Sequence, residues 1–268
     1  MRRGSSNHAE LVASRRPNQV RRVFGGLAGA LGLLTIIPLP SEWADPNIAE
    51  MSDATAWLPL VGASLGAAAG AVRFVAVPLV GPGPSTALAM ATLVLLSGAL
   101  HQDALADFAD GLGVRGDRER RLAVMRDSTL GAFGVLALIG WALLLFAALE
   151  PMSRDHALLA LTVGCAGGRL AALVHAGAAT PARPDGLGAT FRVMPGASLV
   201  ATAFTAATAI VLLGVWRGAL SLGLAAVLGA VTALWARRAF GGRTGDTLGA
   251  GIALTELAVC LALLASWR

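Results

Sequence analysis

Long uncharged stretches alternate with short polar ones along most of this 268-residue chain. A membrane-spanning helix needs about 20 mostly apolar residues. Seven stretches approach that length, and we predict spans at 57–80, 85–101, 128–149, 157–179, 197–215, 218–236 and 248–266. An eighth stretch, 23–39, is shorter and ends at two prolines, so it is either a full span or a re-entrant segment. The pattern predicts an all-α, polytopic membrane bundle of seven or eight helices.

Composition supports a membrane protein. The chain is 56% hydrophobic and 14% charged, whereas a soluble domain is about 25% charged. Its formal net charge is +5, and every basic residue is arginine. These arginines lie beside the apolar stretches, which indicates membrane orientation rather than nucleic-acid binding. Cys165 and Cys260 both fall inside apolar stretches and lack metal-site spacing, so we predict neither a disulfide nor a zinc site.

The placement of arginine predicts the orientation. We expect a basic cytoplasmic tail, 1–22, followed by one integral-membrane catalytic domain, 23–268. If 23–39 does not span and the N-terminus is cytoplasmic, 16 of the 21 arginines fall in four cytoplasmic pieces: 1–22, 102–127, 180–196 and 237–247. Positive charge favours the cytoplasmic side. We therefore predict a multi-pass protein of the cytoplasmic (inner) membrane whose polar face contacts the cytoplasm.

Three aspartates follow the second predicted span within HQDALADFADG. On a helix, Asp103, Asp107 and Asp110 fall within an arc of about 60°. Carboxylates this close repel one another unless a cation lies between them. Mg²⁺, or alternatively Mn²⁺, suits oxygen ligands and commonly bridges to phosphate. We predict a metal site here, and the alternative is a solvated acidic face.

The segment after the aspartates carries candidate phosphate ligands. Arg115 and Arg126 are predicted to bind substrate, whereas Arg118, Arg120 and Arg121 suit general membrane-surface charge. Ser128 is a further candidate substrate contact: it could cap the next helix, and a helix N-terminus also attracts phosphate. Asp127 is a candidate general base, with metal ligation or helix capping as alternatives.

A second candidate site, GGRTGDTLGAGIALTE, leads into the last predicted span. Arg243, Thr244 and Gly245 could cradle phosphate, although a plain glycine-rich helix break is the alternative. Asp246 is the other candidate base. Glu256 lies well inside the span, where a buried acid needs a partner or a function. Arg169 is its candidate partner, and both are predicted to contact substrate unless they form a purely structural pair.

Two other features lie close to the candidate sites in the sequence. In the loop after the fourth predicted span, Arg183 and Asp185 are either substrate contacts or part of a plain Pro/Gly loop. His101 lies on the helix face opposite the aspartates, so we expect it to have a packing or interfacial role.

Three motifs in one order resemble a known family. HQDALADFADG, RRLAVMRDSTLGAFG and GGRTGDTLGA are similar to the conserved segments of adenosylcobinamide-GDP ribazoletransferases, also called cobalamin synthases. TIIPLP, WLPLVGASLG and ARPDGLGA fit as well, so the resemblance covers most of residues 24–256. Ala104 stands where the family usually has glycine and Gln102 where it has an apolar residue. These departures affect local helix packing rather than the three acids.

The resemblance implies a reaction and its partners. Adenosylcobinamide-GDP and α-ribazole, or its phosphate, would give adenosylcobalamin, or its phosphate, and GMP, with Mg²⁺ required. The bilayer is an expected partner, nucleic acid is not, and a homo-oligomer is left open. A CDP-alcohol phosphotransferase is the alternative enzyme, because Asp107-x-x-Asp110-Gly111-x-x-x-Arg115 matches part of that signature. A prenyltransferase of the UbiA type usually has an asparagine directly before its first aspartate, and this chain has none before Asp103. An ion-coupled transporter is the alternative of another class.

Overall fold

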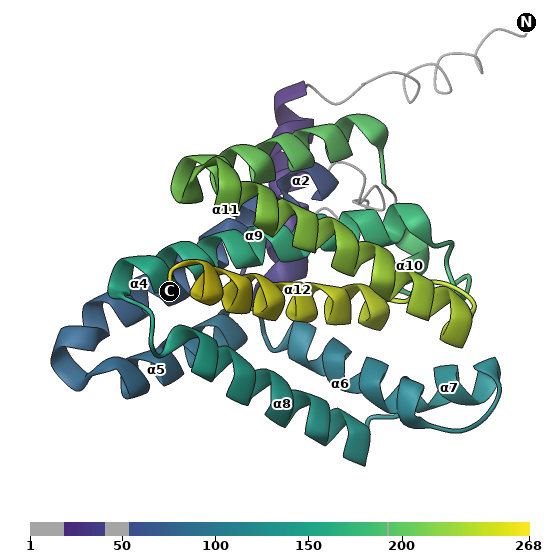
Figure 1. Ribbon diagram of the computed structural model, residues 1–268. Helices are drawn as coiled ribbons and strands as arrows, with labels where there is room; N and C mark the ends of the chain where they lie inside the picture. The colour runs from purple at the N-terminus through teal and green to yellow at the C-terminus, as the bar shows by residue number, and fades with distance from the viewer. Residues whose placement is uncertain (1–18, 41–53, 192) are drawn as a thin grey trace, which may run out of the picture.

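The computed structural model describes residues 19–40, 54–191 and 193–268, and this part of the chain is helical (Figure 1). A single 3₁₀ turn, Thr55–Trp57, leads into α4. Within the described residues the only extended pairing is an isolated bridge between Pro181 and Arg243. The predicted all-α class is confirmed. The helices are α2 (Gln19–Leu34), α4 (Leu58–Val80), α5 (Pro82–Leu96), α6 (Leu100–Gly113), α7 (Arg118–Val124), α8 (Ala132–Leu149), α9 (Arg154–Ala178), α10 (Leu187–Thr190), α11 (Pro195–Phe240) and α12 (Gly245–Ser266).

Five helical segments of the described chain are long and apolar enough to cross a membrane, or six if the bent pair α5–α6 counts as one span. They are Thr55–Val80, Ala132–Leu149, Arg154–Ala178, Pro195–Phe240 and Gly245–Ser266. Four of them match the predicted spans 57–80, 128–149, 157–179 and 248–266 closely. The protein is therefore a multi-pass membrane protein.

The remaining segment, α11 (Pro195–Phe240), contains two spans rather than one. A straight helix of its 46 residues would be about 69 Å long at roughly 1.5 Å per residue, whereas the hydrocarbon core is only about 30 Å thick. Gly214 breaks the helix with φ 77° and ψ 169°, a conformation essentially restricted to glycine. A Cβ on Gly218 would lie 3.0 Å from the Cα of Ile210, so the chain doubles back. The halves correspond to the predicted spans 197–215 and 218–236, and counting them separately gives six or seven spans.

The predicted span 85–101 is wrong at its C-terminal end. Helix α5 ends at Leu96, and α6 begins at Leu100 at an angle of 86° to it. Gly98 and Ala99 both adopt left-handed backbone conformations, with φ of 61° and 57°. Such residues cannot continue a right-handed helix. The aspartates therefore lie on a separate helix rather than on the continuation of a straight span.

The N-terminal segment is a short helix in the described part of the chain. Helix α2 has 16 residues, fewer than the roughly 20 that a span requires. After it the chain is not helical up to Pro40, and the N–H of Ile36 donates to the carbonyl of Leu96. Of the predicted tail, residues 19–22 belong to α2, and 1–18 lie outside the described residues.

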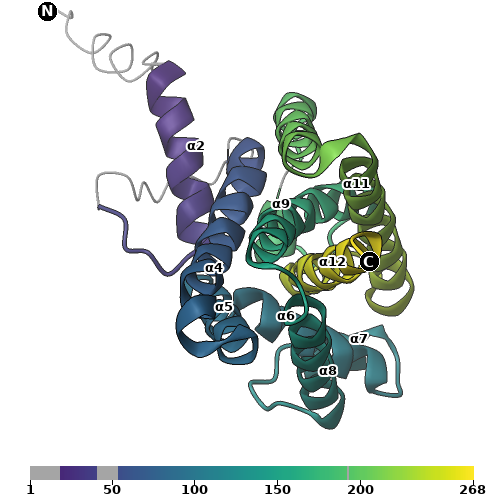
Figure 2. The ribbon, with the colours of Figure 1, turned by 60° about the vertical axis from the view of Figure 1, so that its left-hand side comes forward.

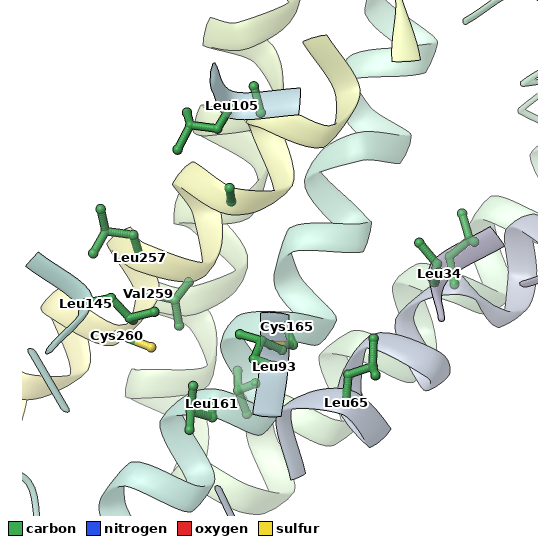
Figure 3. Packing of buried hydrophobic residues seen from close by; sticks show 14 of the residues in the cluster. Leu34, Leu65, Leu93, Leu105, Leu145, Leu161, Cys165, Leu257, Val259 and Cys260 are labelled. Atoms are coloured by element: carbon green, nitrogen blue, oxygen red, sulfur yellow. The ribbon is translucent and has the colours of Figure 1, made fainter. Parts of the chain in front are cut away.

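Helix α9 forms the centre of the bundle, and 78% of its 18-residue apolar stretch is buried. Figure 2 shows α4, α11 and α12 around it. Small residues permit this packing: a Cβ on Gly62 would lie 2.5 Å from the carbonyl oxygen of Cys165, and one on Gly229 would lie 2.5 Å from that of Ala171. Close backbone approach at small residues is the common mode of helix packing in membranes. Buried apolar side chains from α4, α8, α9 and α12 fill the remaining space (Figure 3).

Candidate functional site

Carboxylates from two helices meet where α6 packs against the start of α12. A Cβ on Gly249 would lie 2.5 Å from the Cβ of Ala104, so the helices are in close contact. Asp107 is half-buried and lies close enough to Asp103, Asp110 and Asp246 for their charges to act on it. Asp103 likewise acts on Asp246. The two candidate sites seen separately in the sequence, the aspartate helix and the glycine-rich turn, therefore form one site.

A cavity of about 260 Å³ opens beside these carboxylates. Its charged and polar lining consists of His101, Asp103, Arg169, Arg183 and Asp246. The other walls are mainly leucine, isoleucine and phenylalanine side chains from α2, α4, α12 and the segment 187–191. The cavity therefore combines an apolar interior with a few converging charged groups, which is the usual composition of a ligand site.

Asp110 differs from the other two aspartates of α6, because its carboxylate binds the start of α8. Its two oxygens accept the backbone N–H groups of Gly131 and Gly134, each at 2.8 Å. Asp110 is buried, whereas Asp103 is exposed. The expectation that Ser128 caps α8 is wrong, because α8 begins at Ala132 and Asp110 supplies the acceptor. Metal binding by Asp110 stays a prediction, and both of its oxygens already have partners.

The predicted pairing of Arg169 with Glu256 is confirmed. Their side chains are 0% and 3% exposed and form an ion pair between α9 and α12. The same guanidinium donates to the carbonyl of Cys165 at 3.1 Å and lies 3.5 Å from Nδ1 of His101. Nε of Arg169 and Nε2 of His101 are buried without a partner in the structure. Both residues line the cavity with other atoms of their side chains or backbone.

Sequence reasoning gave His101 a packing role, which agrees with its burial, but did not place it beside the cavity, and it left Arg183 undecided. The helix face of His101, opposite the aspartates, indicated packing, but the 86° bend before α6 turns that face toward α9 and the cavity. Arg183 lies on the cavity wall with its guanidinium 3.8 Å from Asp246. The ARPDGLGA motif was the available signal for Arg183.

The glycine-rich turn before α12 is occupied by internal contacts. Arg243 donates to the carbonyls of Gly188 and Phe191 at 2.9 and 2.8 Å, and to those of Ala176 and Ala179. These four bonds leave one of its five N–H groups free. Arg243 thus fastens the segment after α9 to this turn, and its binding of phosphate stays a prediction.

The next two residues of the turn begin α12. Thr244 is the N-cap, and it forms a reciprocal capping box with Thr247. The hydroxyl of Thr244 also donates to Asp246 at 3.3 Å. Gly245 follows in the first turn and lines the cavity. The capping interaction therefore holds Asp246 at the cavity.

The remaining predicted contacts lie on the exposed loop before α8 and do not line the cavity. Arg126 pairs with Asp185 at 3.0 Å, and both side chains are exposed. Arg115 and Ser128 are exposed as well. The hydroxyl and backbone N–H of Thr129 donate to Asp127 and lower the pKa of its carboxyl, which makes it a weaker base. Of the two candidate bases, Asp246 is therefore better placed.

The donors fit a divalent ion that shares its coordination with a substrate. Among the described residues, no three His, Cys, Asp or Glu side chains form a complete metal-binding group. The acidic side chains at the cavity offer only carboxylate oxygens. Mg²⁺ usually keeps several waters and binds through one or two carboxylates together with substrate phosphates. The carboxylates at the cavity are the ligand type that this mode requires, and metal binding stays a prediction.

Comparison with known proteins identifies the family. A family model described as cobalamin-5-phosphate synthase matches residues 26–264. A protein of Bradyrhizobium diazoefficiens named adenosylcobinamide-GDP ribazoletransferase is 38% identical over 90% of this chain and 94% of its own length. Proteins of that name from Klebsiella pneumoniae and Escherichia coli are 38% and 35% identical over 88% and 87% of this chain, each covered to 97%. No solved structure matches the chain. With this coverage and identity, the chain belongs to the cobalamin-5-phosphate synthase family.

Proposed function

We propose that this protein transfers adenosylcobinamide phosphate from adenosylcobinamide-GDP to α-ribazole or its phosphate and releases GMP. The observation that carries the proposal is the meeting of Asp103 and Asp107 on α6 with Asp246 on α12 beside one cavity. The relatives' names support the two substrates. In the reaction, a ribose hydroxyl oxygen forms a bond to the phosphorus that carries cobinamide. The bond from that phosphorus to the oxygen of GMP breaks, and the hydroxyl proton passes to a base.

Asp103 and Asp107 are the residues that would hold Mg²⁺. When bound, the ion would neutralise charge on the diphosphate and on the departing GMP. Phosphoryl transfer depends mainly on positioning and on balancing charge. Arg183, at the wall of the cavity, supplies a positive charge for a phosphate oxygen. Arg169 and His101 also line this cavity.

Asp246 is the proposed general base. It is half-buried at the cavity, and the Thr244 hydroxyl and the helix start hold it in place. Its neighbour Arg183 lies 3.8 Å away, so a positive charge is close to the place where a phosphate and the hydroxyl would meet. A base must lie within hydrogen-bond reach of the hydroxyl that it deprotonates. Asp246 meets that need better than Asp127, which lies outside the cavity lining.

We place the site at the cytoplasmic face of the inner membrane. Three polar segments, 114–131, 179–191 and 241–246, contact one another at one end of the bundle. Arg118 binds the carbonyl of Ala182, Arg126 pairs with Asp185, and Arg243 binds the carbonyl of Gly188. Arginine accumulation at one side is typical of cytoplasmic loops. This end is also the one that carries the carboxylates, so substrates would enter from the cytoplasm.

The test is a reaction with purified protein in detergent. Adenosylcobinamide-GDP, α-ribazole and Mg²⁺ are supplied, and GMP and the corrinoid product are measured together. We expect equimolar products from the wild type, and none with EDTA or with Asp107→Asn. A folded protein that releases no GMP would contradict the proposal, and CDP-alcohols would be the next substrates because of the partial signature around Asp107.

A further inference from the structure

A second cavity, of about 500 Å³, lies away from the carboxylates. It is bounded by the C-terminal end of α6, by α7 and by the last turns of α11. Its charged and aromatic lining is Arg118, Arg121, Arg238 and Trp235. It shares no lining residue with the carboxylate cavity. The proposed reaction gives it no role.

The three arginines of this cavity lack acidic partners. None of them takes part in an ion pair among the described residues. Arg121 donates to the carbonyls of Gly111 and Leu112 at 3.2 and 2.9 Å, which fixes its charge at the end of α6. Arg118 donates to the carbonyl of Ala182. Within the described residues the Arg238 side chain has no hydrogen bond or ion pair, so none of the three positive charges is paired with an acid there.

The nearest acids do not neutralise this charge. Asp117 caps α7 by accepting the backbone N–H of Arg120 at 2.9 Å, and Glu119 is exposed. Converging arginines recognise phosphate oxygens well, because the guanidinium offers several donors in a fixed plane. The chemistry of the cavity therefore suits a phosphate ester.

The surroundings favour a lipid as the source of the phosphate. Helix α11 is the least buried of the candidate spans. Only 22% of its 18-residue apolar stretch is buried inside the protein, so its outer surface faces lipid. Trp235 on this helix is 45% exposed, and its ring stacks on Phe108 with a 6.3 Å centroid separation. Tryptophan near the end of an apolar helix, followed by arginines, is typical of the membrane–water interface. The cavity thus lies at the level where phospholipid headgroups are found.

We propose that this cavity binds the headgroup phosphate of an anionic phospholipid. Arg118, Arg121 and Arg238 would surround the phosphate, and Trp235 would pack against the glycerol region. Because the arginines come from α7 and α11, a bound headgroup would link these two helices beside the end of α6. The inference is independent of the proposed reaction.

The experiment measures lipid retention by native mass spectrometry without any substrate. Purified protein is offered phosphatidylglycerol or phosphatidylcholine in equal amounts, and Arg238→Gln is compared with Arg237→Gln. Both variants lose one exposed arginine from the same helix end, but only Arg238 lines the cavity. A basic residue near an anionic surface contributes about 1 kcal/mol, so Arg238→Gln should bind phosphatidylglycerol about fivefold more weakly. Arg237→Gln should behave like the wild type.

Three results would overturn the proposal. Equal retention of both lipids by the wild-type protein would show that no anionic site exists. Equal losses in the two variants would indicate diffuse surface charge instead of a cavity. Displacement of the lipid by equimolar inorganic phosphate or GMP would identify a soluble phosphate site. Because GMP release is assayed separately, failure here leaves the proposed reaction standing.

Discussion

Two buried arginines, Arg73 on α4 and Arg169 on α9, are equally hidden but bonded differently. Arg73 is 1% exposed and Arg169 is 0% exposed. Arg73 donates to Thr86 at 2.9 Å and, through one nitrogen, to the carbonyls of Leu149 and Met152, each at 2.9 Å. Arg169 pairs with Glu256, but its Nε has no partner and it lines the cavity. Burial alone therefore does not separate a structural arginine from a candidate site residue, whereas position beside the cavity does.

Arg73 and Asp110 bind opposite ends of α8. Arg73 binds carbonyls at the C-terminal end of α8, which need partners and carry partial negative charge. Asp110 caps the N-terminal end of the same helix, beside the carboxylate site. Figure 1 shows α8 running between these ends. One end of the bundle is thus closed by internal bonds, and the other keeps polar groups available for a ligand.

The largest expected effect comes from Arg73→Met. The substitution leaves several buried carbonyls without a donor, at about 1–3 kcal/mol each. We expect the folded protein to be lost from the membrane fraction or to unfold at a much lower temperature. Thermal unfolding in detergent measures this loss. A variant with wild-type stability would show that the closed end of the bundle does not depend on Arg73.

Arg169→Met tests the other arginine. Removing one member of a buried ion pair costs about 3–5 kcal/mol, because the remaining charge has no partner. The double variant Arg169→Met/Glu256→Leu removes both charges and should recover most of the stability. GMP release should stay low in the double variant, since the cavity has lost its buried cation. Recovery of turnover along with stability would mean that the pair is purely structural.

The next prediction concerns the rate of GMP release and the carboxylates beside the cavity. Asp107→Asn should lower GMP release by at least about 100-fold, in the range seen when one group that stabilises developing charge is removed. Stability should change little, because Asp107 makes no side-chain hydrogen bond to any other described residue. Asp155→Asn, which removes an exposed acid from the first turn of α9, is the matched control and should leave the rate unchanged. A similar loss in both would point to overall charge instead of a site.

The sequence allowed some of these features to be predicted for clear physical reasons. Spans follow from the length of apolar runs, and the Arg169–Glu256 pair follows because charges inside a membrane need partners. The break before α6 was not predictable, because Gly98 and Ala99 lie inside an uncharged run. The structural tie made by Arg243 was hidden as well. Its acceptors are main-chain carbonyls, which carry no signature in the sequence.

The carboxylates show the same limit. Helical spacing correctly placed three aspartates on one helix, but it could not tell which neighbours each would meet. Asp110 meets the start of α8, whereas Asp103 and Asp107 meet the region of Asp246. That distinction depends on how α8 and α12 pack around α6, and no periodicity within one segment contains it.

The smallest expected effect, from Asp110→Asn, separates a cap from a metal ligand. Asparagine keeps one acceptor oxygen but presents an N–H₂ group to the second backbone N–H, so one hydrogen bond and the favourable charge at the helix start are lost. Loss of such a cap costs about 0.5–2 kcal/mol, and we expect a moderately lower unfolding temperature. The Mg²⁺ concentration that gives half-maximal GMP release should stay at the wild-type value, whereas Asp103→Asn should raise it. If Asp110→Asn raises it equally, the shared helical arc predicted the ligands correctly, and Asp110 binds the metal in addition to capping α8.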